Sequence, residues 1–231
     1  MSRKLKALVC IAHPDDEVLF FGGLIAAKNY DWTIICVTDA NADQLGAHRK
    51  QQFKKSCQLL GVKKIIFLDY PDVFDKRLDT SRLTDDLKSI SDRTQFKFVF
   101  THGVLGEYGH QHHQDVCFAT YKSFLAGPKT KIFSVAYNLY PDIKINLNEK
   151  LFKLKTKILW KIYASETRRL LNFLPATSCE GFTQVTLKEV EEIYSFIIKD
   201  QNSLNKKNLK TYLWLYDYIA SRDFELKSRP F

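Results

Sequence analysis

The stretch that decides the fold is residues 7–17, which read ALVCIAHPDDE. Its first half is a short apolar run, as expected of a strand that is covered on both faces of a sheet. Its second half places a histidine, a proline and three carboxylates directly behind that strand. Ligands of open α/β sheets bind beyond the carboxyl ends of the strands, so we expect a functional site here.

The same pattern of apolar runs recurs further along the chain. Residues 33–37, 64–68 and 97–101 are predicted to be strands. Helical patterns lie between the strands, at residues 18–29, 46–60 and 81–92. This alternation predicts a doubly wound, Rossmann-like α/β fold with a mostly parallel sheet and helices on both faces.

The remainder of the chain is expected to complete one domain over residues 1–231. A helix at 114–124 and a strand at 131–136 end a core of about residues 1–140. Apolar residues at three- to four-residue spacing then predict a mostly helical C-terminal extension of about residues 145–231. Its aromatic segment, residues 209–219, is expected in the core or in the contact of a homo-oligomer.

A second polar cluster follows the strand at 97–101, and it reads YGHQHH over residues 108–113. Catalytic zinc typically keeps three protein ligands and a water, and His nitrogen and Asp oxygen suit it. His13 and Asp16 could face one ion, and His110 or His113 would supply the third donor. The alternative is that the Asp residues of the first cluster only cap the next helix. The presence of both clusters favours the metal site.

The two clusters resemble the motifs of the LmbE-like, or PIG-L-like, zinc-dependent N-deacetylases of N-acetylglucosamine-type substrates. The resemblance covers about residues 5–125, including Arg49 and the segment 60–62. Beyond these residues it is limited to 157–166, where Tyr163-Ala164-Ser165-Glu166 looks like a family motif usually written with Gln in place of Glu166.

The resemblance implies the ligand set and its ion. His13, Asp16 and His113 would hold one Zn²⁺ per chain, although such donors also accept other divalent metals.

The resemblance also implies catalytic roles for three further residues and a substrate-binding role for a fourth. Asp15 would be the general base, and His110 would stabilise charge and protonate the leaving amine. Tyr108 matches a position that polarises the scissile carbonyl, and Arg49 matches an arginine of the substrate pocket.

This chain departs from the family pattern near the proposed acid. Residues 111–112 are Gln-His where the family often has Pro-Asp, which removes an acid that could orient His110. We expect Glu107 or Asp115 to take over, or His110 to be oriented differently. Gln52 stands where the family usually has Glu.

The expected chemistry is hydrolysis of an unactivated amide. Zinc can lower the pKa of bound water to about 7 and polarise the carbonyl. Asp15 would take the water proton, and the metal with Tyr108 would hold the developing oxyanion. Imidazole titrates near neutral pH, so a protonated His110 could supply the proton that the amine needs to leave.

The apolar runs and the N-terminal residues indicate where the protein is located. The longest nearly apolar run, residues 18–27, is too short to span a bilayer, which takes about 20 residues. The N-terminus does not look like a secretory signal, so we expect a cytoplasmic protein with no integral membrane segment.

The five cysteines are odd in number and widely spaced, which predicts no disulfide framework or thiolate zinc site. Cys10 and Cys36 are expected to be buried in strands.

Three classes of function are to be compared with this sequence. The favoured one is a zinc N-deacetylase acting on a small N-acetylated amino sugar or a sugar conjugate, which could be nucleotide- or lipid-linked. The alternative is a nucleotide-binding transferase of doubly wound fold without a catalytic metal, but no G-x-G-x-x-G follows the first strand. The third is a basic nucleic-acid-binding protein, which only the basic pI and the aromatic content suggest. No clustered basic stripe supports it, so no nucleic acid partner is expected.

Overall fold

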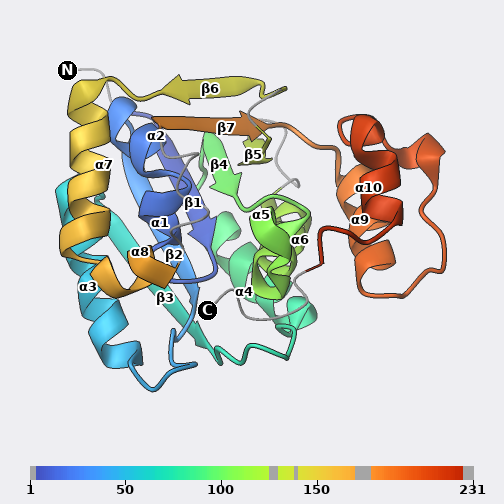
Figure 1. Cartoon of the computed structure of the whole chain (residues 1–231), viewed down its shortest axis with the longest axis horizontal. Helices are drawn as coiled ribbons and strands as arrows, with labels where there is room; N and C mark the ends of the chain where they lie inside the picture. The colour runs from blue at the N-terminus through green and yellow to red at the C-terminus, as the bar shows by residue number, and fades with distance from the viewer. Residues whose placement is uncertain (1–3, 125–129, 138–139, 170–177, 226–231) are drawn as a thin grey trace.

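A seven-stranded sheet in the order β3-β2-β1-β4-β5-β7-β6 forms the centre of the molecule (Figure 1). The computed structural model describes residues 4–124, 130–137, 140–169 and 178–225. The strands are β1 Lys6–Ile11, β2 Asp31–Thr38, β3 Lys64–Tyr70, β4 Phe98–Thr101, β5 Lys131–Val135, β6 Ile143–Asn146 and β7 Cys179–Thr183. Strands β1 to β5 run parallel, whereas β7 is antiparallel to both β5 and β6. The predicted mostly parallel, doubly wound sheet is confirmed.

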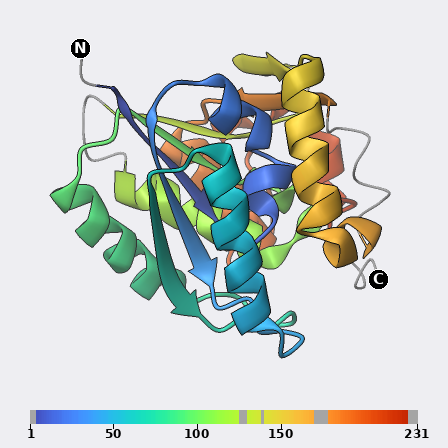
Figure 2. The same cartoon turned by 90° about the vertical axis from the view of Figure 1, so that its left-hand side faces the viewer.

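Helices cover both faces of this sheet. They are α1 Asp16–Leu19, α2 Gly22–Ala27, α3 Gly46–Leu60, α4 Thr80–Arg93, α5 Gly106–Gly109, α6 Gln111–Phe124, α7 Glu149–Lys161, α8 Ala164–Arg169, α9 Leu187–Ile197 and α10 Tyr216–Ala220. Figure 2 shows α4 on one side of the parallel strands and α3 and α7 on the other. In the part of the chain that is described, no helix is both long and apolar enough to cross a membrane.

The alternation of side chains along β1 builds two separate cores. Val9 and Ile11 pack with the apolar residues of α1, α2, α3 and α7. Leu8 and Cys10 point to the other face, where α4, α6 and α9 close the second core. Every residue of β1 after Lys6 is buried, as is Cys36 in β2, because the strand lies between these two layers.

The predicted helix at residues 18–29 is broken into α1 and α2. Gly23 has no room for a side chain, since an added Cβ would lie 2.7 Å from Leu147 Cδ1. The Glu180 carboxylate, on β7, accepts the N–H groups of Gly23 and Leu24, at 2.7 Å each. A distant strand therefore supplies the acceptor for the start of α2, and the sequence near α2 does not show it.

The C-terminal extension is less helical than predicted. The expected helices α7 and α9 are present, but β6 and β7 also lie in this part and extend the sheet. The aromatic segment 209–219 forms a 3-10 turn, Leu213–Leu215, and the short α10 instead of one helix. Tyr212 and Ile219 are buried as expected of core residues, while Trp214 is 47% exposed. The expected contact with a second copy stays a prediction.

Lys155 and Glu180 form a buried ion pair at 2.7 Å, with side chains 1% and 2% exposed. Removing one partner of such a pair leaves a buried charge without its counterion. We expect Lys155→Ala to lower the free energy of unfolding by about 3 kcal/mol, measured by urea denaturation. Lys153→Ala is the control on the same helix. Its pair with Glu149 is exposed, so its loss should cost no more than about 0.5 kcal/mol.

Candidate metal centre and active site

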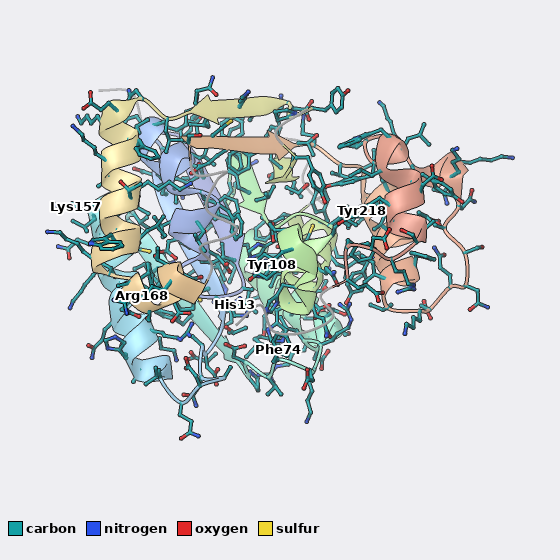
Figure 3. The ribbon with its side chains drawn as sticks, viewed as in Figure 1. His13, Phe74, Tyr108, Lys157, Arg168 and Tyr218 are labelled. Carbon is teal, nitrogen blue, oxygen red and sulfur yellow. The ribbon has the colours of Figure 1, made fainter. Side chains whose placement is uncertain are left out.

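The two polar clusters of the sequence meet at the carboxyl ends of β1 and β4. His13, in the loop after β1, lies close to Tyr108 in the middle of the molecule, with Phe74 from the loop after β3 nearby (Figure 3). Phe74 contacts the ring of His110 edge-on, with ring centroids 6.1 Å apart. Parallel strands bring their ends to one edge of the sheet, so residues about a hundred positions apart become neighbours.

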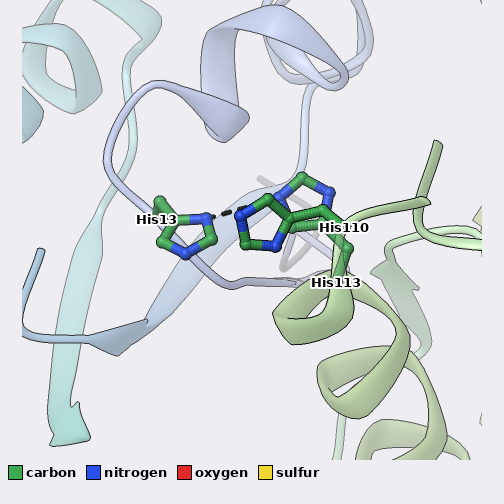
Figure 4. A group of neighbouring side chains, drawn as sticks. All are labelled: His13, His110 and His113. Carbon is green, nitrogen blue, oxygen red and sulfur yellow. Dashed lines mark hydrogen bonds between the residues drawn. The ribbon is translucent and has the colours of Figure 1, made fainter. Parts of the chain in front are cut away.

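The three predicted ligands face one another. His113 Nε2 lies 3.3 Å from His13 Nδ1, the contact drawn as a dashed line in Figure 4. Asp16 places Oδ2 3.5 Å from His13 Nδ1 and Oδ1 3.5 Å from His113 Nε2. Ligand atoms about 2.0–2.1 Å from a tetrahedral zinc are roughly 3.3 Å apart. The spacing of these side chains therefore fits one small divalent cation.

Glu107 fixes the protonation of His113 in the form that can bind a metal ion. The Glu107 Oε2 atom lies 2.5 Å from His113 Nδ1, so this nitrogen carries the proton and donates it. The lone pair of His113 Nε2 is then directed at His13 and Asp16. Burial and the neighbouring His102 lower the pKa of His113 to about 4, which keeps the ring neutral. A metal-binding histidine usually donates its outer N–H to a carboxylate in this way.

The carboxylates around His13 favour a positive charge at this place. Burial alone would lower the pKa of His13, but Asp72 and Asp16 outweigh it and raise the pKa to about 10. The field that favours a proton on the ring equally favours a metal cation beside it.

Three further groupings of potential ligands in the described part of the chain share residues with this set, and one of them, His13 with Asp72 and His112, is described below. Asp16, His102 and His113 also approach one another, as do His13, His110 and His113. His102 Nε2 accepts the N–H of Ala12 at 3.0 Å, so its lone pair is already in use. His102 was not among the predicted site residues, although it directly follows β4. It stacks on His113 with ring centroids 3.8 Å apart and supports that ring.

Asp15 does not cap α1. Its side chain makes no capping hydrogen bond, and its φ of 102° lies in a region that non-glycine residues rarely adopt. Burial, followed by the charges of Asp16 and Glu166, raises the pKa of Asp15 well above its usual value, while Arg49 lowers it. Strained backbone is a feature of functional loops, and a carboxyl group with a raised pKa is suited to accept and hold a proton.

The C-terminal motif of residues 163–166 reaches back to the first cluster. The Tyr163 hydroxyl donates to Glu17 Oε1 at 2.9 Å, and Glu166 forms an ion pair with Arg49 at 3.0 Å. Arg49 also pairs with Asp43 at 2.8 Å. Its buried Nε has no hydrogen-bond partner among the described residues, which leaves a donor available to a ligand.

His110 and Tyr108 complete the cluster. The ring of His110 lies 4.7 Å from that of His13, and the ring of Tyr108 lies 5.4 Å from that of His113, between centroids. Burial and the three neighbouring imidazoles of His13, His112 and His113 lower the pKa of His110 well below its usual value. The predicted acid role of His110 stays a prediction, and in this arrangement its protonation is opposed by its neighbours.

The expectation that Glu107 or Asp115 orients His110 is wrong. Glu107 contacts His113 and His102, and Asp115 binds Arg77, Tyr194 and the backbone of Leu78. His110 is oriented differently: its Nδ1 atom lies 3.3 Å from the backbone N–H of His112. At position 52, the Gln52 amide donates to the carbonyl of Ile162 and joins α3 to the end of α7.

A candidate cation site at the strand ends of a doubly wound sheet is typical of metal-binding α/β proteins. Residues 8–124 match the family model described as PIG-L: GlcNAc-PI de-N-acetylase. The chain belongs to this family.

Two curated relatives are similar in sequence to this chain. N-acetylglucosaminyl-phosphatidylinositol de-N-acetylase of Saccharomyces cerevisiae is 26% identical over 208 residues, covering 80% of this chain and 67% of the yeast protein. The 1D-myo-inositol 2-acetamido-2-deoxy-alpha-D-glucopyranoside deacetylase of Corynebacterium diphtheriae is 33% identical over 144 residues, covering 47% of this chain and 48% of that protein. The alignments therefore span about half to two thirds of these relatives.

A solved structure supports the fold. The N,N'-diacetylchitobiose deacetylase from Pyrococcus horikoshii superposes with a TM-score of 0.60 at 23% sequence identity. The match covers 80% of this chain and 85% of that one.

Glu107→Gln tests the arrangement around His113. The variant loses the charge that accepts from two imidazoles, and loss of such an outer carboxylate typically weakens metal binding by about 10- to 100-fold. We expect this loss for Zn²⁺ in a competition titration with a chelating dye. Glu191→Gln removes a surface carboxylate that is 41% exposed and should leave the affinity unchanged. Equal affinities in both variants would contradict the role of Glu107.

Proposed function

We propose that this protein removes the N-acetyl group from an N-acetylglucosamine-like amino sugar within a sugar conjugate, with Zn²⁺ as its metal. The observation that carries the proposal is the convergence of His13, Asp16 and His113, whose facing atoms lie 3.3 to 3.5 Å apart. Family membership and the deacetylase names of both curated relatives support the reaction class. The cytoplasmic location stays a prediction.

Each residue of the cluster has a distinct task in this reaction. His13, Asp16 and His113 would hold the cation, which when bound supplies a Lewis acid that acidifies water and polarises the amide carbonyl. Asp15 takes the proton of the attacking water, and its raised pKa lets it retain that proton. It is therefore also placed to return a proton toward the departing amine.

The surrounding residues bind the substrate. Tyr108 and His110 line the side of the cluster formed by α5 and α6, where Tyr108 is assigned the developing oxyanion. Burial, with the nearby charges of Asp16 and Asp15, raises the pKa of Tyr108 well above its usual value, so the hydroxyl keeps its proton and donates it. Arg49, held by Asp43 and Glu166, offers a fixed donor for a sugar hydroxyl.

The nucleotide-binding transferase has less support. A phosphate-binding loop presents backbone N–H groups to an anion. Here the loop after β1 buries the carboxyl groups of Asp15, Asp16 and Glu17 at that place, and these repel a phosphate.

Release of acetate tests the proposal directly. We expect the zinc-loaded protein to release acetate from an N-acetylglucosaminyl conjugate and to lose this activity in the presence of a chelator. Asp15→Asn should retain about one equivalent of zinc but lower the rate by at least about 100-fold, since removing a general base costs this much. Full turnover by Asp15→Asn would contradict its role. Failure of a broad screen of N-acetylated sugars and conjugates would contradict the function.

A second experiment distinguishes the roles of His110, which lies between α5 and α6, and His113, which lies in α6. His113→Ala removes a proposed ligand and should abolish stoichiometric zinc binding in elemental analysis. His110→Ala should retain zinc while slowing acetate release, because His110 lies beside the cluster without being one of its three ligands. The reverse pattern would exchange the two assignments.

A further inference from the structure

The ring of His13 has a second set of partners on the side away from His113. Its Nε2 atom lies 3.1 Å from His112 Nδ1 and 3.6 Å from Asp72 Oδ1. His112 Nδ1 and Asp72 Oδ1 are themselves 3.5 Å apart. Three side chains from the ends of β1 and β3 and from α6 thus direct one atom each toward a common point.

A backbone carbonyl on the far side of the ring from His13 fixes the orientation of His112. His112 is fully buried, and its Nε2 atom lies 2.8 Å from the carbonyl oxygen of Lys76. A carbonyl only accepts, so Nε2 carries the proton and Nδ1 presents its lone pair to His13 and Asp72. The imidazole is therefore held as a neutral ring with its free lone pair directed at the common point, like a histidine ligand with an outer carbonyl partner.

The spacing of these atoms fits a divalent cation. Their separations of 3.1, 3.5 and 3.6 Å bracket the roughly 3.3 Å expected between ligands of a tetrahedral zinc. They also match the separations in the group of His13, Asp16 and His113. The ring of His13 lies between the two groups and faces each with a different nitrogen.

We propose that Asp72, His112 and the Nε2 atom of His13 form a second binding site for a divalent cation such as Zn²⁺. This inference rests on the proposed function, because His13 is also assigned to the first ion. To bind there, His13 breaks its Nε2–H bond, forms a bond from Nε2 to the metal and releases one proton to solvent. The two positive charges of the ion are then balanced by the imidazolate and by the Asp72 carboxylate.

The cost of the second proton makes this the weaker of the two sites. Binding of the first ion displaces one proton of the His13 ring, and binding of the second must displace the other proton from the same ring. The second ion therefore binds at higher free zinc.

Equilibrium dialysis of the full chain against a series of free zinc concentrations, followed by elemental analysis, tests the second site. We expect the wild type to bind a first equivalent and, at higher zinc, a second. Asp72→Asn keeps an oxygen facing His13 Nε2 but loses the negative ligand. It should therefore retain the first equivalent and weaken the second by about tenfold or more.

Two control variants remove a carboxylate or an imidazole that is not part of the proposed second site. Asp75→Asn deletes an exposed carboxylate of the same loop, and His48→Ala deletes an exposed histidine remote from both clusters. Both should bind two equivalents like the wild type. Thermal denaturation of each variant verifies that it is folded.

The outcomes separate this inference from the proposed function. A single equivalent in the wild type at all zinc concentrations overturns the second site and leaves the first intact. A second equivalent that survives unchanged in Asp72→Asn is surface binding and also overturns it. No zinc bound by the folded wild type overturns both proposals.

Discussion

The burial of three consecutive carboxyl groups behind β1 is the constraint on which the rest of the site depends. Asp15, Asp16 and Glu17 are 7%, 2% and 0% exposed. Buried charge is costly unless it is paired, so distant parts of the chain must supply partners. The imidazoles of His102 and His113 approach Asp16, and Tyr163 donates to Glu17. Together these contacts join the end of β4, the start of α6 and the end of α7 around one loop.

The departures of this chain from its family pattern have physical consequences that can be followed in the structure. Glu166, which stands where the family usually has Gln, adds a charged partner to Arg49. His112, in place of an acid, turns its side chain toward His13 and leaves only its backbone N–H to His110. The histidine at position 112 therefore affects the candidate metal centre more directly than the proposed acid.

The parallel part of the fold could be predicted because its signals are local. The strands β1 to β4 are short apolar runs, and α3, α4 and α6 carry regular apolar spacing, so the predicted bounds of each lie within a few residues of the observed ones. The sequence pattern does not indicate strands β6 and β7. β6 alternates Ile with polar residues over four positions, and β7 buries Glu180, which is an acceptable strand residue only because Lys155 and two backbone N–H groups pair with it.

The sequence by itself determined which chemical groups are available and which strand ends carry them: a His-Asp-Asp cluster after β1 and a histidine cluster after β4. Only the tertiary structure decided which atom of each group faces which partner. The direction of an imidazole lone pair is set by what lies behind the ring, here Glu107 for His113 and the carbonyl of Lys76 for His112. Those partners are brought there by folding, and Lys76 is 36 positions from His112, so spacing along the chain could not reveal them.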